Sequence, residues 1–278
     1  MSNTPATPQA AALVAAARKP NFIPKVGIIL GSGLGGLANQ LEQSVSIPYA
    51  ELPGFPALHV AGHAGNLVLG YLQGVPVACL QGRAHYYEGL EGRDVKMLVR
   101  TLKKKGCEIL LITNASGSLR KEVSAGELVM ITDHINFQGK NPLLGPNDEE
   151  FGPRFFPMDT VYDAELQARL LKSAEANNIT LHKGTYISVL GPNFETPAEI
   201  RAFKTLGADV IGMSTVPEVL VAAHCGLRVA LVAAISNLAA GLSAHPLSHE
   251  ETLQGAQMGA ANLTRLVKNF VGSFRDSQ

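Results

Sequence analysis

The sequence predicts an α/β protein: a single domain in which helices flank a mixed central β-sheet. Short apolar runs rich in β-branched residues alternate with longer segments of helical period, which favours a sheet covered on both faces. Gln73-Gly74 between two apolar runs indicates a hairpin, so part of the sheet should be antiparallel. The 278 residues can form one large core, and no repeat or low-complexity linker divides residues 1–278.

The expected strands are apolar runs bounded by turn residues. They cover residues 25–30, 67–72, 75–80, 108–113, 128–131, 184–190, 209–213 and 228–236. The expected helices carry a helical period, and two have clear cap signals: Pro197 follows Thr196, and Ser248 precedes Glu251 by three positions. The helices cover residues 8–18, 34–43, 92–105, 163–177, 197–206, 217–224 and 248–274. The core should span about residues 22–272, with residues 1–20 as an N-terminal helix or extension.

Composition narrows the class of partner. The 23 basic and 23 acidic side chains cancel and form no basic block, so no nucleic-acid partner is expected. No apolar run approaches the roughly 18 residues that cross a membrane, and no signal peptide is recognised. Cys79, Cys107 and Cys225 are sparse and lack metal-ligand spacing, which is typical of buried thiols in a reducing compartment. We therefore expect a cytoplasmic protein without a metal site.

Polar or glycine-rich segments follow six of the expected strands. Ligands of α/β sheets bind beyond the carboxyl ends of the strands, so these segments predict one shared site. They are residues 31–36, 81–89, 114–117 and 191–195, together with Ser214 and Asn237.

The glycine loop allows three interpretations. Gly31, Gly33 and Gly36 match the dinucleotide fingerprint, with Glu51 about twenty residues further on. Alternatively, the glycine amides and the Ser32 hydroxyl hold a free phosphate at a helix N-terminus, or the loop is a tight turn without a ligand. The segment after Glu51 is rich in proline and does not continue a βαβ unit, which favours phosphate.

Four further side chains suit an anion and a planar base. Arg83 and His85 lie two positions apart at a strand end, so they should point the same way and clamp an anion. Glu195 and Asn237 follow apolar strands and offer the carboxylate and amide that match a purine edge. A metal site at His59 and His63 is not expected, because prolines and Gly62 disfavour a helix there and no third ligand is apparent.

Together these segments resemble the trimeric-type purine nucleoside phosphorylases, with the motifs in the family's order over about residues 22–272. The resemblance rests on residues 31–35, 61–65, 82–89, 114–117, 145–148, 151–152, 191–196, 212–218 and 224–227, and on Asn237.

The resemblance implies a homotrimer, the phosphorolysis of inosine, guanosine or xanthosine, and a role for many residues of this chain. Inorganic phosphate would be a co-substrate and no cofactor would be needed. The implied phosphate ligands are Ser32, His63, Arg83, His85, Ala115 and Ser214. The implied ribose contacts are Tyr87, Tyr186, Met213 and His249, with Phe151 from the neighbouring subunit. The implied base contacts are Ser116, Gly117, Phe194, Glu195, Ile211 and Asn237, and the implied catalytic residues are His85, Glu195, Asn237 and His249.

Two positions need separate comment beside this resemblance, and a third, Asn237, bears on the choice of substrate. Ser116 stands where the family usually has alanine, and its hydroxyl either touches the base or caps the turn. His245 competes with His249 for the ribose 5′-hydroxyl, although the glutamates after His249 favour the latter. Related phosphorylases that cleave 6-aminopurines carry aspartate at the position of Asn237, so an amide here favours 6-oxopurines. The alternative function is a non-catalytic purine nucleoside sensor, which would lack the phosphate ligands.

Overall fold

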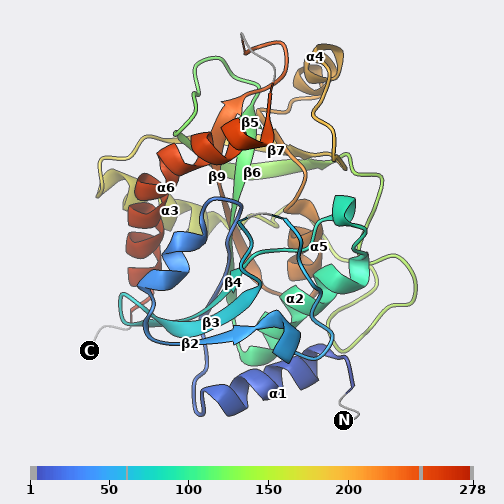
Figure 1. The fold of residues 1–278 in the computed structure, drawn as a ribbon, viewed down its shortest axis with the longest axis vertical. Coiled ribbons are helices and arrows are strands. Elements are labelled where there is room, and N and C mark those ends of the chain that lie inside the picture. The colour runs from blue at the N-terminus through green and yellow to red at the C-terminus, as the bar shows by residue number, and fades with distance from the viewer. Residues whose placement is uncertain (1–4, 61, 244–246, 276–278) are drawn as a thin grey trace.

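Nine strands form one mixed sheet in this computed structural model, which describes residues 5–60, 62–243 and 247–275 (Figure 1). Their order across the sheet is β2-β3-β4-β1-β5-β8-β7-β6-β9. The strands are β1 Val26–Ile29, β2 Glu42–Pro48, β3 Asn66–Leu72, β4 Val75–Gln81, β5 Ile109–Ser118, β6 Leu128–Asn136, β7 Leu181–Ser188, β8 Val210–Gly212 and β9 Arg228–Leu238.

The sheet curls at one end so that its last strand returns to its middle. β9 pairs with β6 on one side and lies parallel to β5 on the other, which closes a ring of β5, β8, β7, β6 and β9. Parallel pairs join β1 to β4 and to β5, while β3 is antiparallel to both β2 and β4. The mixed sheet expected from the sequence is therefore confirmed.

Helices cover both faces of the sheet, as the alternation of strands and helices predicts (Figure 1). One apolar cluster packs α1, α2 and α5 against the sheet, and a second packs α3 and α6 against the opposite face. α4 covers a third, smaller cluster built on Ile187 and Ile211. The helices are α1 Pro8–Arg18, α2 Gly92–Lys105, α3 Ala164–Glu175, α4 Pro197–Thr205, α5 Val216–His224 and α6 His249–Gly272.

Local signals behave as expected at the hairpin and at two helix starts. Gln73 and Gly74 both have positive φ angles, 53° and 78°, and join antiparallel β3 and β4. Thr196 caps α4 in a capping box, with Pro197 in the first turn. The Ser248 side chain accepts a hydrogen bond from the Glu251 amide at the start of α6. Each signal is local, so the sequence alone was sufficient to predict it.

The expected helix over residues 34–43 is wrong. The chain forms a 3₁₀ helix, η1 Gly35–Gln40, and then enters β2, a strand that the sequence analysis missed. β2 is an edge strand whose polar residues are largely exposed, so it lacks the apolar run that marks a strand. Only the short η1 joins β1 to β2, and β3 and β4 separate these two strands in the sheet, so β1 does not begin the βαβ unit of a dinucleotide-binding fold.

Candidate active site

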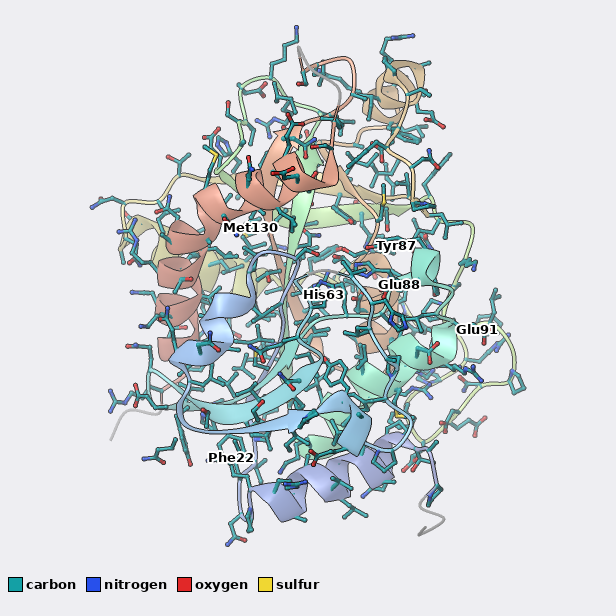
Figure 2. The ribbon with its side chains drawn as sticks, viewed as in Figure 1. Phe22, His63, Tyr87, Glu88, Glu91 and Met130 are labelled. Atoms are coloured by element: carbon teal, nitrogen blue, oxygen red, sulfur yellow. The ribbon has the colours of Figure 1, made fainter. Side chains whose placement is uncertain are left out.

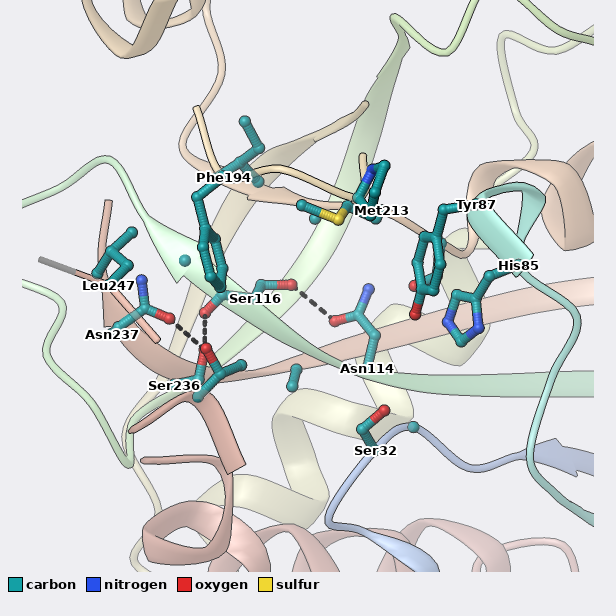
Figure 3. A pocket seen from close by; sticks show the side chains of 18 of the residues that line it. Ser32, His85, Tyr87, Asn114, Ser116, Phe194, Met213, Ser236, Asn237 and Leu247 are labelled. Atoms are coloured by element: carbon teal, nitrogen blue, oxygen red, sulfur yellow. Dashed lines mark hydrogen bonds between the residues drawn. The ribbon is translucent and has the colours of Figure 1, made fainter. Parts of the chain in front are cut away.

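One cavity of about 460 Å³ opens where the six polar segments meet (Figure 3). All six segments contribute to its wall, so the structure brings them together in one cavity as expected. Residues 114–117 and Asn237, however, lie inside the long strands β5 and β9 and do not follow them. The lining residues that carry polar or aromatic side chains are Ser32, Arg83, His85, Tyr87, Asn114, Ser116, Phe194, Glu195, Ser214, Ser236, Asn237 and Thr252.

A buried guanidinium forms the floor of one end of the cavity. Arg83 is 1% exposed, and its Nη1 donates to the hydroxyls of Ser214 at 3.0 Å and Thr215 at 2.8 Å. Nη2 donates to the Thr113 carbonyl at 2.5 Å. Arg83 Nε lies 3.5 Å from Glu218 Oε1, and Glu218 is 1% exposed. The arginine fork is thus held by protein acceptors, and its charge reaches the cavity beside Ser214.

Three rings stack beside this guanidinium. The centroid of His85 lies 5.2 Å from that of His63 and 4.6 Å from that of Tyr87. His85 Nδ1 is 2.9 Å from Glu88 Oε1, and His63, Tyr87 and Glu88 lie close together in the middle of the molecule (Figure 2). The sequence places Arg83 and His85 on one side of an extended strand. Both line the cavity, but Arg83 is turned into the core by its own partners.

The imidazole of His63 lies within hydrogen-bond distance of the Ser32 hydroxyl. Its Nε2 lies 3.1 Å from Ser32 Oγ, which faces the cavity from the glycine loop. Burial, and then the neighbouring His85 and Arg83, lower the pKa of His63 to about 3, so the imidazole is neutral near pH 7. A neutral imidazole can accept from Ser32 or donate to it, but it adds no positive charge to this end. The ring is not itself a lining residue.

The glycine loop lets the backbone after β1 pass close to the backbone of β5. A side chain at Gly31 would place its Cβ 2.7 Å from Asn114 Cα, so only glycine lets β1 end against β5. Gly33 has a φ of +75°, which turns the chain after Ser32. The helix that follows the loop, η1, is a short 3₁₀ helix and not the longer helix expected over residues 34–43. The Ser32 hydroxyl remains as a cavity group.

The opposite end of the cavity combines an aromatic face with a carboxylate and an amide (Figure 3). Phe194 and Glu195 enter from the segment before α4, and Asn237 enters from β9. Burial raises the pKa of Glu195 above the usual carboxyl value. Asn237 Oδ1 accepts from Ser236 Oγ at 2.6 Å, and Nδ2 donates one N–H to the Leu238 carbonyl at 3.0 Å. Nδ2 carries a second N–H for a ligand.

A β-bulge places Ser236 and Asn237 together on the cavity wall. The register between β5 and β9 shifts at this point, because Ser116 pairs with Ile235 while Gly117 pairs with Asn237. In a regular strand, adjacent side chains would point to opposite faces. The bulge turns both toward the cavity, where the Ser236 hydroxyl also contacts the Ser116 carbonyl at 3.1 Å. Ser236 was not predicted, since a bulge depends on the partner strand.

Most of the predicted site residues line this cavity, and three of those whose side chains the structure describes, His63, Phe151 and Tyr186, do not. The lining residues among the predictions are Ser32, Arg83, His85, Tyr87, Ala115, Ser116, Gly117, Phe194, Glu195, Ile211, Met213, Ser214 and Asn237. His63 lies behind Ser32. Tyr186 is fully buried, its hydroxyl donates to the Ser214 carbonyl at 3.2 Å, and it does not line the cavity.

Phe151 packs away from the cavity of its own chain, and the side chains of His245 and His249 lie outside the described residues. The Phe151 ring lies against Arg100, with 4.1 Å between the guanidinium carbon and the ring centroid, and it does not line the cavity of its own chain. His249 is the first residue of α6, and its side chain is not among those the structure describes. His245 lies outside the described residues altogether.

The Ser116 hydroxyl donates its hydrogen to Asn114 Oδ1 at 2.9 Å, while its oxygen, on the cavity wall, can still accept. Asn114 also lines the cavity, and the sequence pattern assigns it no role of its own. Other lining residues that were not predicted are Val60, Ala239, Leu247 and Thr252, which carry no distinctive signal in one sequence.

Among the residues that the structure describes, no group of three or more His, Cys, Asp or Glu side chains could hold a metal ion. Within the same ranges, no helix combines the length and hydropathy needed to cross a membrane.

The fold and the cavity together define a class of protein: an α/β protein with one cavity that suits an anion at one end and a planar, hydrogen-bonding base at the other. The profile of the family described as the phosphorylase superfamily matches residues 25–272. The chain is 49% identical to purine nucleoside phosphorylase 1 of Bacillus subtilis over 251 residues, 90% of this chain and 93% of the relative. It is 44% identical to the bovine purine nucleoside phosphorylase over 257 residues, 90% of this chain and 89% of the relative.

Solved structures show the same likeness. The purine nucleoside phosphorylase of Schistosoma mansoni in complex with inosine superposes with a TM-score of 0.92 at 35% identity, covering 98% of this chain and 99% of that one. A second form from the same organism, in complex with cytosine and ribose-1-phosphate, gives a TM-score of 0.91 at 39% identity, covering 98% and 97%. The chain belongs to the purine nucleoside phosphorylases of the phosphorylase superfamily.

Proposed function

We propose that the chain catalyses the reversible phosphorolysis of 6-oxopurine ribonucleosides and deoxyribonucleosides, giving the free base and ribose or deoxyribose 1-phosphate. The observation that carries this proposal is the single cavity with Arg83 and Ser214 at one end and Glu195 and Asn237 at the other. Inorganic phosphate is the co-substrate and no cofactor takes part. A non-catalytic sensor is disfavoured, because a base site alone would not require the buried guanidinium and hydroxyls of the anion end.

The mechanism follows from the charges that develop as the glycosidic bond breaks. Phosphate is an anion at neutral pH, so it attacks the anomeric carbon without a general base. Positive charge develops on the ribose ring in an oxocarbenium-like transition state, and negative charge develops on the leaving purine. Asn237 donates its second Nδ2–H to the purine and so stabilises that negative charge. The Glu195 carboxylate accepts a hydrogen bond from N1–H of the 6-oxopurine.

The proposed roles of the remaining residues follow their places around the cavity. Ser32, His85, the Ala115 backbone and Ser214 hold phosphate, with Arg83 supplying charge and His63 orienting Ser32. Tyr87 and Met213 contact the ribose, together with His249. Phe194 stacks on the base, beside Ser116, Gly117 and Ile211.

The deciding experiment measures base release from inosine, guanosine, xanthosine and adenosine, each with and without inorganic phosphate. We expect phosphate-dependent cleavage of the 6-oxopurine nucleosides and little cleavage of adenosine, because Asn237 donates to an oxygen at position 6. Cleavage without phosphate would show a hydrolase, and tight nucleoside binding without cleavage would show a sensor. Identification of ribose 1-phosphate among the products completes the assignment.

A homotrimer in which Phe151 reaches a neighbouring site is the proposed assembly. Two observations support it: Phe151 does not line its own cavity, and Phe155 of the same loop is 89% exposed. We expect three copies by sedimentation velocity, and we expect Phe151→Ala to raise KM for inosine while leaving KM for phosphate unchanged. A fully active monomer would contradict both the trimer and the role of Phe151.

The three buried free cysteines support the further proposal of a cytoplasmic location.

A further inference from the structure

The hydroxyl of Thr215 stands at the junction of three polar side chains behind the cavity. It is fully buried, and its Oγ1 receives N–H groups from Arg83 Nη1 at 2.8 Å and Asn114 Nδ2 at 2.9 Å. The same oxygen lies 3.0 Å from Ser214 Oγ. Thr215 does not line the cavity, whereas Arg83, Asn114 and Ser214 do.

The direction of each hydrogen bond follows from counting donors and acceptors. A hydroxyl oxygen accepts two hydrogen bonds and donates one, whereas guanidinium and amide N–H groups only donate. Arg83 and Asn114 fill both acceptor positions of Thr215, so the Thr215 hydrogen must go to Ser214 Oγ. Ser214 then accepts from Thr215 and from Arg83 Nη1 at 3.0 Å. Its own hydrogen is left as a donor on the cavity side.

The backbone at this point is built to hold that geometry. Thr215 has a φ of 76° and a ψ of −53°, and the Val216 amide donates to the Ser214 carbonyl at 2.8 Å. This is a γ-turn of the rare, strained kind, which is unusual for a β-branched residue. The Ser214 carbonyl also accepts from Tyr186 Oη at 3.2 Å and Ser188 Oγ at 2.9 Å. These three contacts hold the Ser214 carbonyl, and the Ser214 amide donates to Tyr186 Oη at 3.3 Å.

We propose that Thr215 is a positioning residue for the anion end: it commits the Ser214 hydroxyl to donate into the cavity, where a phosphate oxygen accepts the hydrogen. The inference rests on the proposed function, since it concerns how that site receives phosphate. It also gives Ser116 a role in this chain. The Ser116 hydroxyl donates to Asn114 Oδ1, which leaves the Asn114 amide N–H directed at Thr215.

The test compares Thr215→Val, which keeps the shape of the side chain, with Thr215→Ser, which keeps the hydroxyl. Thr215→Val is expected to raise KM for phosphate about 10- to 100-fold, the range for losing a hydrogen bond to a charged group. KM for inosine should stay within about twofold, and Thr215→Ser should behave like the wild type. Thr101→Val is the matched control, because Thr101 is also buried and its hydroxyl bonds only within α2.

Two further measurements separate positioning from stability. Thr215→Gly lacks the hydroxyl but suits the positive φ, so it should fold and show the same rise in KM for phosphate. In a Ser214→Ala background, Thr215→Val should have no further effect on phosphate, because it acts through Ser214. An unchanged KM for phosphate in either folded variant, or a Thr215→Ser enzyme as impaired as Thr215→Val, would overturn the inference.

Calorimetric titration with inorganic phosphate keeps this test independent of catalysis. A wild-type protein that binds phosphate but cleaves no nucleoside would remove the proposed function, and the variants would still be compared by their Kd for phosphate. A wild-type enzyme that cleaves inosine with phosphate, beside a Thr215→Val variant of equal phosphate Kd, would remove the inference and leave the function intact.

Discussion

Replacing Asn237 by alanine is expected to lower kcat for inosine about 100- to 1000-fold, the usual effect of removing one donor aimed at a developing negative charge. The amide is well prepared for this task, because Ser236 Oγ holds Oδ1 and the Leu238 carbonyl takes one of the two Nδ2 hydrogens. The remaining N–H has a fixed direction before substrate binds. Single-turnover rates at saturating phosphate measure the chemical step directly.

Two comparisons show whether the effect comes from the donor. Asn237→Asp keeps the oxygen that Ser236 holds but replaces the donor by an acceptor, so preference should move from inosine towards adenosine. Asn177→Ala is the matched control, because this amide only donates to the Ser173 carbonyl at the end of α3. An Asn237→Ala enzyme with the wild-type rate on inosine would refute the assignment of the base end.

The strands that carry the site were predictable because their signals are local. Each apolar run that crosses the centre of the sheet is buried on both faces, and its polar continuation reaches the cavity. β2 escaped prediction for the opposite reason. Its sequence is polar, its residues are largely exposed, and only pairing with β3 makes it a strand. Apolar periodicity in a sequence reflects burial, and an exposed edge strand has few buried residues to produce such a pattern.

Within the site, the sequence predicted which types of side chain gather there better than it predicted which side chains face the cavity. Tyr186 was expected at the ribose, yet its hydroxyl holds the Ser214 backbone from a fully buried position. Ser236 was not expected at all, because its exposure to the cavity depends on a register shift between β5 and β9. Both cases depend on contacts between residues far apart in the chain. A single sequence carries no signal for such contacts.

The buried pair of Arg83 and Glu218 allows folding and phosphate binding to be separated. Arg83→Met should lower the free energy of unfolding by about 3–5 kcal/mol, because it leaves an uncompensated buried carboxylate. Glu218 is 1% exposed, and its Oε1 has no hydrogen-bond donor among the described residues, so the guanidinium is its nearest compensating charge. Urea unfolding at pH 7 measures this loss.

Removing the charge of both Arg83 and Glu218 should restore the free energy of unfolding but not phosphate binding. In the double variant Arg83→Met with Glu218→Gln, no buried charge remains unpaired, so most of the lost stability should return. Phosphate binding should not return, because the positive charge beside Ser214 is still missing, and we expect KM for phosphate to stay at least about 100-fold above that of the wild type. A double variant that recovers both properties would show that Arg83 serves the fold only. If both variants bind phosphate weakly while only the single variant is unstable, the loss of affinity comes from the missing guanidinium. That result would place the anion at this end of the cavity.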